Sequence, residues 1–207
     1  MKKPMLHLAV FASGTGSNLR AIHAAIEHGS LAARLAVVLS NRREAGALDF
    51  AREHGIPAVS LAGLAGPDEE ASRMLDVLRE HGADFVALAG YMRLVPSEVV
   101  AAFSGRMLNI HPALLPSFGG KGMYGHHVHE AVLAAGVKVT GVTVHLVDEH
   151  YDRGPIVMQA CVPVHDDDSA ETLAVRVLLT EHQVYARALQ LFAEGRVKIM
   201  NHRSVIT

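Results

Sequence analysis

Residues 107–116 read MLNIHPALLP, and this stretch decides both the fold and the place of the site. Its apolar residues predict a buried strand over 107–111, which ends where Pro112 removes the backbone donor that strand pairing needs. Side chains two positions apart lie on one face of a strand, so Asn109 and His111 are expected side by side. Buried amide and imidazole groups need hydrogen-bond partners. The pattern therefore predicts a polar pair at the carboxyl end of a strand, where open α/β sheets bind their ligands.

Upstream of that strand, apolar runs alternate with segments of helical spacing. The predicted strands are residues 6–12, 33–39, 57–61 and 84–89, and the predicted helices are residues 19–28, 41–54, 67–81 and 96–103. Asn41 and Glu44 resemble a capping box for the second helix. Regular alternation of this kind is typical of an α/β fold with a doubly wound, mostly parallel sheet and helices on both faces.

Downstream of residue 116 the pattern favours an antiparallel C-terminal portion. The predicted elements are a helix over 126–135, strands over 140–147 and 156–164, a helix from 168 to 194 and an edge strand over 197–200. Alternating polar residues indicate that the first of these strands is half exposed and that the second is its hairpin partner. Asp168 and Glu171 resemble a second capping box. We expect one domain over residues 1–207, with a phosphate-binding half (about 1–100) and a catalytic half (about 101–207).

The composition excludes several classes of protein. Of the 207 residues, 50% are hydrophobic and the net charge is −2, so the chain can bury a core and has no basic surface for nucleic acid. The single Cys161 forms no internal disulfide, which is typical of a reducing compartment. No apolar run reaches the ~20 residues that cross a membrane. We expect a soluble, cytoplasmic protein without a nucleic-acid or membrane partner.

The segment SGTGSN, residues 13–18, connects the first predicted strand to the first predicted helix. Free N–H groups and the dipole at a helix N-terminus attract anions. The segment is not a Walker A loop, and Leu19 occupies the third glycine position of a dinucleotide fingerprint. It predicts an anion site for a mononucleotide or a sugar phosphate, with the alternative that Ser17 or Asn18 merely caps the helix.

Asn109, His111 and Asp152 form the candidate catalytic set. Asp152 lies in the loop DEHYDRGP, after a strand that is expected to bring it to the end of strand 107–111. A carboxylate beside an imidazole raises the pKa of the imidazole, which suits a proton donor near neutral pH. An amide N–H beside it stabilises an oxyanion in acyl transfer. The alternative is a satisfied buried Asn/His pair with a capping aspartate.

Several other histidines require an interpretation. His126, His127 and His129 lie at a helix start, but no cysteine or acidic pair accompanies them at ligand spacing except Glu130, so no metal is expected. His145 either points into the cleft or is packed in the core.

Four motifs together resemble the folate-dependent phosphoribosylglycinamide formyltransferases of purine biosynthesis. They are SGTGSNL, LAGYMRLV, NIHPALLPSF and GVTVHLVDEHYDRGPIV, and the resemblance extends over nearly the whole chain. It implies transfer of the formyl group of 10-formyltetrahydrofolate, a co-substrate, to the amine of glycinamide ribonucleotide. It also implies small-molecule substrates and a monomer or homodimer.

The resemblance also implies roles for single residues. Gly16, Ser17 and Asn18 would hold the substrate phosphate, and Glu181 would accept hydrogen bonds from the ribose hydroxyls. Met92, Arg93, Leu94 and Val95 would line the folate site, with Arg93 available for a folate carboxylate, and Asn109 would also touch the formyl group. His111 would be the general acid, and Asp152 would orient it and raise its pKa.

Two departures from the family pattern and three alternatives remain. The arginine that relatives carry near the start of the third helix is missing from residues 67–73 except as Arg73, and the loop over 117–125 is longer and richer in glycine, which indicates mobility. The alternatives are a hydrolase that releases formate, a transferase acting on methionyl-tRNA, and a non-catalytic nucleotide-phosphate binding module. The first two would be expected to carry an extra domain, for which 207 residues leave no room.

Overall fold

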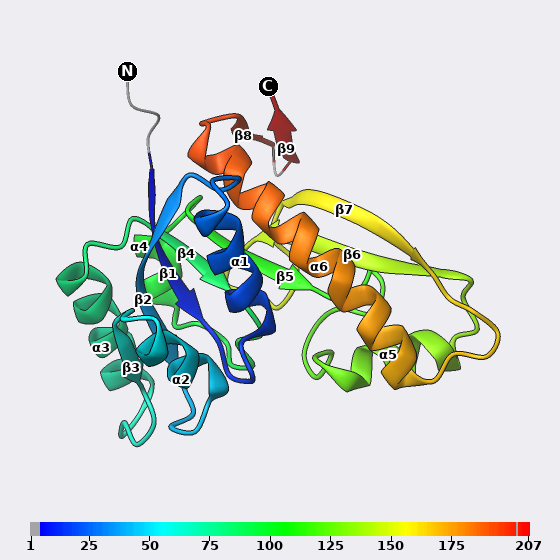
Figure 1. Cartoon of the computed structure of the whole chain (residues 1–207), viewed down its shortest axis with the longest axis horizontal. Helices are drawn as coiled ribbons and strands as arrows, with labels where there is room; N and C mark the ends of the chain where they lie inside the picture. The colour runs from blue at the N-terminus through cyan, green and yellow to red at the C-terminus, as the bar shows by residue number, and fades with distance from the viewer. Residues whose placement is uncertain (1–4, 202) are drawn as a thin grey trace.

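Seven strands form one sheet, in the order β3-β2-β1-β4-β5-β6-β7 (Figure 1). The computed structural model describes residues 5–201 and 203–207. The strands are β1 (Leu6–Phe11), β2 (Ala33–Ser40), β3 (Ala58–Ser60), β4 (Phe85–Leu88), β5 (Met107–His111), β6 (Val139–Leu146) and β7 (Ile156–Pro163). Strands β1 to β5 pair in parallel, whereas β5–β6 and β6–β7 pair antiparallel. The predicted doubly wound sheet with an antiparallel C-terminal portion is confirmed.

Helices cover both faces of the sheet, because the buried strands carry apolar side chains on both faces. They are α1 (Ser17–Glu27), α2 (Gly46–Glu53), α3 (Pro67–Glu80), α4 (Ser97–Ala102), α5 (His126–Ala134) and α6 (Ala170–Ala193). Leu8 and Val10 of β1 pack in one core with α1, α2, α5 and α6. Ala9 and Phe11, which alternate with them, pack in a second core with α3 and α4.

Helix α6 is fastened to the middle of the sheet by one tyrosine. The fully buried Tyr185 places its hydroxyl 3.0 Å from the carbonyl oxygens of both Leu88 on β4 and Leu108 on β5. Its single O–H is shared between two acceptors on adjacent strands. Burial and the neighbouring Glu181 raise the pKa of Tyr185 above its ordinary value, so the hydroxyl keeps its proton.

Strand β6 differs from the prediction, because seven of its eight residues are buried and only Val139 is exposed. Two of its polar residues, Thr143 and His145, form hydrogen bonds inside the protein, whereas the buried Thr140 hydroxyl has no partner in the described chain. The Thr143 hydroxyl donates to the Ala113 carbonyl at 2.7 Å and accepts from the Leu115 N–H at 3.0 Å. Polar alternation here reflects internal hydrogen bonds to residues 113–115 and not a solvent-facing surface.

Both predicted capping boxes are wrong in detail. Helix α2 begins at Gly46 without a side-chain cap, and Asn41 instead accepts a hydrogen bond from the Ser13 hydroxyl at 2.6 Å. The box of α6 is formed by Ser169 and Thr172.

The aspartate that was expected to cap α6 has another role. Asp168 binds the guanidinium of Arg176 through both carboxylate oxygens, at 2.6 and 2.7 Å. The predicted edge strand is also placed differently. Strand β8 (Val197–Met200) pairs antiparallel with β9 (Arg203–Ile206) in a separate two-stranded hairpin, and Asn201 after β8 lies in the left-handed region at φ 48°.

In the described ranges, 5–201 and 203–207, no helix is both long enough and apolar enough to cross a membrane.

Candidate active site

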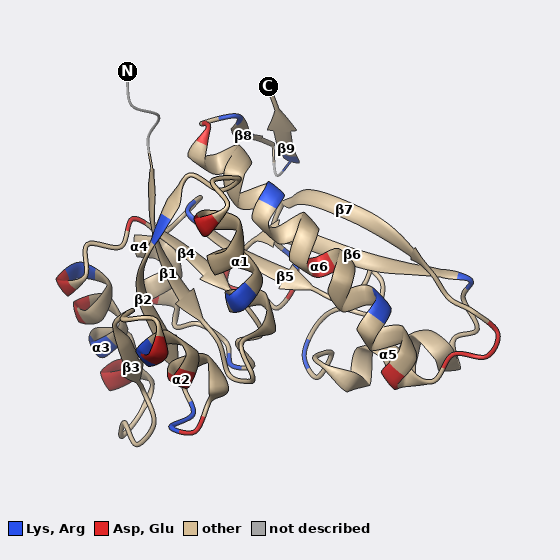
Figure 2. Cartoon of the chain, viewed as in Figure 1, with Lys and Arg blue, Asp and Glu red and all other residues tan. Residues whose placement is uncertain are grey.

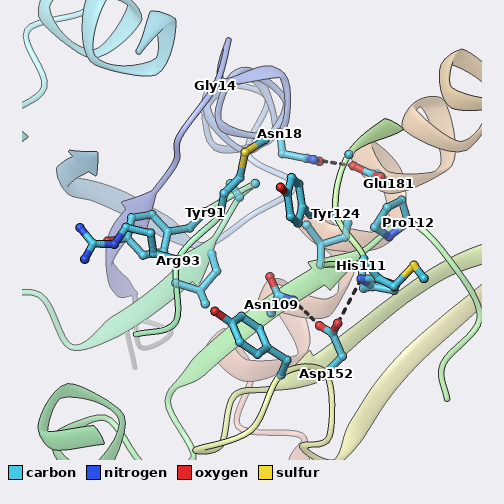
Figure 3. A pocket seen from close by; sticks show the side chains of 18 of the residues that line it. Gly14, Asn18, Tyr91, Arg93, Asn109, His111, Pro112, Tyr124, Asp152 and Glu181 are labelled. Atoms are coloured by element: carbon cyan, nitrogen blue, oxygen red, sulfur yellow. Dashed lines mark hydrogen bonds and ion pairs between the residues drawn. The ribbon is translucent and has the colours of Figure 1, made fainter. Parts of the chain in front are cut away.

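A cavity of about 710 Å³ opens at the carboxyl ends of β1, β4 and β5 (Figure 3). Every residue to which the sequence analysis gave a site role lines it: Gly16, Ser17, Asn18, Met92, Arg93, Leu94, Val95, Asn109, His111, Asp152 and Glu181. The anion-binding turn and the polar pair of β5 therefore share one cavity, as the sheet order requires, because β4 alone separates β1 from β5.

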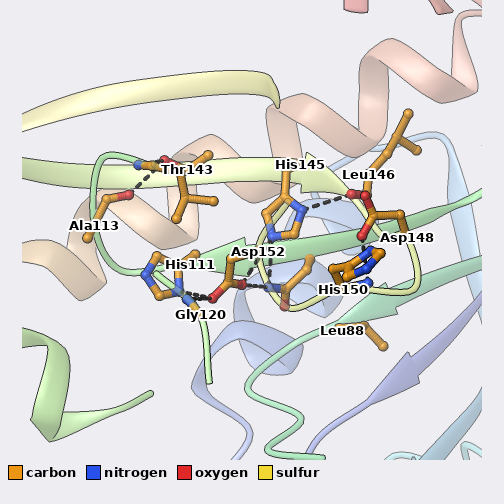
Figure 4. Close-up of polar contacts among 12 residues, drawn as sticks. Leu88, His111, Ala113, Gly120, Thr143, His145, Leu146, Asp148, His150 and Asp152 are labelled. Atoms are coloured by element: carbon orange, nitrogen blue, oxygen red, sulfur yellow. Dashed lines mark hydrogen bonds and ion pairs between the residues drawn. The ribbon is translucent and has the colours of Figure 1, made fainter. Parts of the chain in front are cut away.

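Asp152 lies against the Asn109–His111 pair (Figure 3), and its contacts with His111 and Gly120 are drawn in Figure 4. Its Oδ2 is 3.6 Å from Nδ1 of His111 and accepts a hydrogen bond of 2.9 Å from the Gly120 N–H. Its Oδ1 is 3.4 Å from Nδ2 of Asn109. The loop reaches this position with Asp152 itself in the left-handed region, at φ 55°. The juxtaposition on which the candidate set depends is therefore present.

His145 orients Asn109 from the neighbouring strand. The two residues are directly opposite in the β5–β6 register. His145 is 2% exposed, and its Nδ1–H donates to the Leu146 carbonyl at 2.8 Å. Its Nε2 is then free to accept from Nδ2 of Asn109 at 3.1 Å. His145 is thus buried and also lines the cavity, so it combines the two alternatives given above, a packed histidine and a histidine at the cleft.

The expectation that Asp152 raises the pKa of His111 above its ordinary value is wrong for the net shift. Burial lowers the pKa of His111 more than the attractions of Asp152 and the Phe118 carbonyl raise it, and His145 adds to the lowering. Burial works in the opposite sense on Asp152, but the nearby imidazoles of His145 and His111, together with the hydrogen bond from the Gly120 N–H, lower its pKa below the ordinary value. The resting pair is therefore a neutral imidazole beside a carboxylate.

The loop over residues 117–125 forms hydrogen bonds with two of the candidate catalytic side chains, His111 and Asp152. Nε2–H of His111 donates to the Phe118 carbonyl at 2.8 Å, and the Gly120 N–H holds the Asp152 carboxylate. Because a carbonyl only accepts, the proton of neutral His111 lies on Nε2 and the lone pair of Nδ1 faces Asp152. Sequence reasoning did not identify these two backbone partners, because nothing in a glycine-rich segment marks the groups that it will bind.

The glycine-rich turn presents the N-terminus of α1 to the cavity. Gly16 has φ 81°, and a Cβ there would approach the Cα of Ala47 at 2.9 Å, so only glycine fits. No side chain caps α1, and the alternative that Ser17 or Asn18 acts as the cap is wrong. The uncapped first turn keeps its N–H groups available to an anion.

Asn18 holds the one carboxylate that α6 directs at this cavity. Its Nδ2 donates to Oε2 of Glu181 at 2.6 Å, and both side chains are buried. Burial raises the pKa of Glu181, and the hydrogen bond from Asn18 partly opposes this. One of the two N–H donors of the Asn18 amide is therefore used on Glu181.

The segment over residues 91–95 follows β4, and residues at the ends of β1 and β2 fix its position. The Met92 N–H donates to the Ser13 hydroxyl at 2.9 Å, which connects it through Ser13 to Asn41 at the end of β2. The Tyr91 ring packs edge-on against Phe11, with ring centroids 5.5 Å apart. Three neighbouring strands thus determine where the backbone of this segment lies.

Arg93 has a partner that the sequence did not reveal. Its guanidinium lies 2.9 Å from Oε2 of Glu70, which is 4% exposed, and the Tyr91 hydroxyl donates to Oε1 of the same carboxylate at 3.1 Å. Burial and Glu70 together raise the pKa of Tyr91 far above its ordinary value. Arg73 pairs with Glu80 at 3.5 Å on the outer face of α3 and does not replace the missing arginine.

The histidines at the start of α5 pair with carboxylates. His126 lies 3.1 Å from Glu171, and His127 lies 3.3 Å from Glu130. Among the residues that the structure describes, no group of three histidine, cysteine, aspartate or glutamate side chains is arranged to hold a metal ion.

His129 is expected to make the protein less stable in mild acid. It is 5% exposed, its Nδ1 has no hydrogen-bond partner in the described chain, and burial with the nearby His126 and His111 lowers its pKa from 6.5 to about 4. Between those values the unfolded chain binds a proton that the folded protein refuses, so stability falls as the pH falls. Urea unfolding at pH 7 to 4 should show a smaller loss for His129→Leu than for the parent. The exposed His127→Leu is the control, and equal losses in all three proteins would contradict the prediction.

Comparison with known proteins agrees with this geometry. The formyl transferase family matches residues 6–189. The chain is 47% identical over 192 residues to the chloroplastic phosphoribosylglycinamide formyltransferase of Vigna unguiculata, which covers 92% of this chain and 62% of that protein. It is 36% identical to the phosphoribosylglycinamide formyltransferase of Escherichia coli (strain K12), over 94% of this chain and 90% of that one.

Solved structures give the same result. Glycinamide ribonucleotide transformylase 1 from Symbiobacterium toebii superposes with a TM-score of 0.93 at 40% identity, covering 99% of this chain and 95% of that one. A formyltetrahydrofolate deformylase from Pseudomonas syringae pv. tomato superposes with a TM-score of 0.87 at 27% identity, covering 98% of this chain and 66% of that one. This chain spans less than two thirds of the Vigna unguiculata protein. On the match over residues 6–189, the chain belongs to the formyl transferase family.

Proposed function

We propose that the chain transfers the formyl group of 10-formyltetrahydrofolate to the amine of glycinamide ribonucleotide, giving N-formylglycinamide ribonucleotide. One observation carries the proposal: Asp152 lies against Asn109 and His111 inside a cavity that also contains the uncapped N-terminus of α1. The named relatives support the choice of substrates. Because one sheet builds both sides of the cavity, residues 1–207 act in this proposal as one domain.

The proposed reaction begins when the substrate amine attacks the formyl carbon. A C–N bond forms, and the formyl oxygen becomes an oxyanion. Nδ1 of His111, which is unprotonated at rest, takes up the amine proton, and Asp152 at 3.6 Å stabilises the resulting imidazolium. His111 then gives this proton to the folate nitrogen as its bond to the formyl carbon breaks. His111 is the general acid of the second step because it is the base of the first.

Asn109 is the proposed oxyanion donor. Its amide already donates to His145 at 3.1 Å and to Asp152 at 3.4 Å. The second contact is at the long limit of a hydrogen bond, so this N–H is the one that can turn to the formyl oxygen at little cost. His145 keeps the amide plane in place while that exchange occurs.

The two substrates are assigned to different parts of the cavity. The phosphate of glycinamide ribonucleotide binds the N–H groups at Gly16, Ser17 and Asn18, and Glu181 accepts from the ribose hydroxyls. The folate ring system lies along Met92 to Val95, where backbone groups read its polar edge. No step of this scheme uses a metal ion.

The test is an absorbance assay for tetrahydrofolate release from 10-formyltetrahydrofolate, with and without glycinamide ribonucleotide. Release that requires the ribonucleotide is expected. Release without it would identify a deformylase, and absence of release under both conditions would leave only a binding protein.

Glu181→Ala is expected to raise the KM for glycinamide ribonucleotide by about 10-fold or more, because a hydrogen bond to a charged group contributes roughly 1.5–3 kcal/mol. The KM for the folate should change little, since Glu181 lies on the side of Asn18. Glu171→Ala, an exposed carboxylate in the first turn of the same helix, is the matched control. Steady-state kinetics in both substrates measure the effect, and an unchanged ribonucleotide KM would remove Glu181 from the site.

A further inference from the structure

A second hollow of about 510 Å³ adjoins the main cavity, and none of the roles assigned above uses it. It lies over the end of β2, and its lining residues are Ser13, Gly14, Thr15, Arg42, Arg43, Glu44, Ala45 and Gly46. Gly14 and Thr15 also line the main cavity, so the two spaces meet at the glycine-rich turn. A ligand bound in one can therefore extend into the other.

The hollow has an excess of positive charge. Two guanidinium groups line it together with one carboxylate, Glu44. Within residues 5–201 and 203–207, neither Arg42 nor Arg43 has a carboxylate within salt-bridge distance. Figure 2 shows adjacent basic and acidic residues in the loop between β2 and α2, at the edge of the molecule. The chemistry favours an anionic ligand that reaches in from the neighbouring cavity.

Arg42 is placed at the boundary with the proposed folate site. Its Nη2 lies 4.0 Å from the sulfur of Met92, and Met92 lines the main cavity with 37% of its surface exposed. In the proposed arrangement the folate rings lie along the segment 92–95 and the glutamate end lies at Met92, the lining residue that contacts Arg42.

Arg93, the residue that the resemblance offered for that glutamate, is already paired. The buried Glu70 takes its positive charge at 2.9 Å, and the Tyr91 hydroxyl holds Glu70 in place. A second carboxylate near Arg93 would meet a neutralised pair and not a free cation. Arg42, which contacts the Met92 sulfur, and its neighbour Arg43 have no such carboxylate partner among the described residues.

We propose that the hollow at Arg42 and Arg43 binds the carboxylates of a γ-linked glutamate tail on the folate co-substrate. This inference rests on the proposed function, because it requires a folate in the main cavity. Each added γ-linked glutamate carries one more carboxylate, so affinity should rise with tail length until both guanidinium groups are engaged. The arginines are exposed, so the gain per pair is small and is screened by salt.

The experiment compares tetrahydrofolate carrying one glutamate with tetrahydrofolate carrying three, by titration calorimetry on the full chain under reducing conditions. The parent is expected to bind the triglutamate about 3- to 10-fold more tightly at low salt, and less so as salt is added. In the double variant Arg42→Ala/Arg43→Ala this ratio should fall towards one. Arg52→Ala, which removes an exposed arginine of α2 that pairs with Asp49, should keep the parent ratio.

Three results would overturn the inference. The first is a parent that binds both forms equally, and the second is a double variant that retains the parent ratio. The third is a loss of the ratio in Arg93→Ala but not in the double variant, which would place the tail at Arg93.

Weaker binding of glycinamide ribonucleotide by the double variant, with the folate ratio intact, would assign the hollow to the phosphate instead. A parent that binds neither folate would remove the proposed function itself, a failure distinct from the loss of a ratio.

Discussion

His111→Ala is expected to lower kcat by about 10²–10⁴-fold, the usual contribution of a positioned general acid–base group. In the proposed mechanism the imidazole takes the amine proton and returns it to the leaving nitrogen, and its position is set by Asp152 beside Nδ1 and the Phe118 carbonyl at Nε2. The KM values should change far less than kcat. Single-turnover and steady-state kinetics separate the two effects.

Because His111 is buried, a second variant separates chemistry from folding. His111→Gln can keep the hydrogen bond to Phe118 but cannot carry the proton, so it should fold like the parent and remain as slow as the alanine variant. His127→Ala, at an exposed histidine, is the matched control. Near-normal turnover in His111→Gln would defeat the mechanism.

Asn109→Ala and Asp152→Asn act on the same step. Asn109→Ala should cost about 10²–10³-fold, the range for loss of one oxyanion donor. Asp152→Asn should also lower kcat, because it removes the charge that stabilises the His111 imidazolium. Because the three side chains act as one unit, the double variants should be little slower than the worse single variant.

Gly154→Ala is expected to have the second largest effect. A Cβ at this position would lie 1.8 Å from the backbone oxygen of Leu146 and 2.8 Å from its carbonyl carbon, so the loop must move. The Leu146 N–H also bonds the Pro155 carbonyl at 2.9 Å, which holds the loop against β6. We expect a loss of ~3 kcal/mol in the free energy of unfolding, at the upper end for overpacking.

The same substitution should also lower activity, because Asp152 lies two residues away and its carboxylate is placed by this loop. Urea unfolding and kcat are the two measurements. Gly14→Ala is the control for stability, since a Cβ there meets no atom within 4 Å. An unchanged unfolding midpoint in Gly154→Ala would contradict the prediction, because it would show that the loop can adopt another conformation without loss of stability.

The sequence predicted the sheet and the adjacency of Asn109 and His111 in the candidate site, because both depend on local patterns. The strand before Pro112 could be recognised from its apolar residues, and the order of strands and helices indicated which strand ends meet. Asn109 and His111 share a face by the period of a strand alone. The position of the strand before it predicted that Asp152 lies near the end of strand 107–111. Its role beside His111 was implied by the family resemblance.

What the sequence did not predict is non-local. Burial outweighs Asp152 in setting the pKa of His111, and the depth of burial depends on packing. Glu70 meets Arg93 only because α3 crosses beside the end of β4, and no spacing between the two residues indicates this. The pairing of His145 with Asn109 depends on the register of β5 with β6.

The capping errors have a different cause. Asn41 had the residue type of a helix cap, but the Ser13 hydroxyl competes for its side-chain oxygen. Ser169 and Thr172 form the box at α6 one position later than predicted, because Asp168 is held by Arg176. Local motifs are reliable only where no distant partner competes for the same atoms.

The shared hydroxyl of Tyr185 has a consequence for selectivity between amines. Tyr185 joins β4 to β5 just beneath Asn109, and Glu181 lies one helical turn earlier on the same rigid rod. In the proposed mechanism the distance between Glu181, which accepts from the ribose, and His111, which moves the proton, is therefore set mainly by α6 and the sheet. An acceptor whose amine lies a bond too near to its ribose or too far from it is expected to bind without reacting, so selectivity would depend on distance as well as on contact.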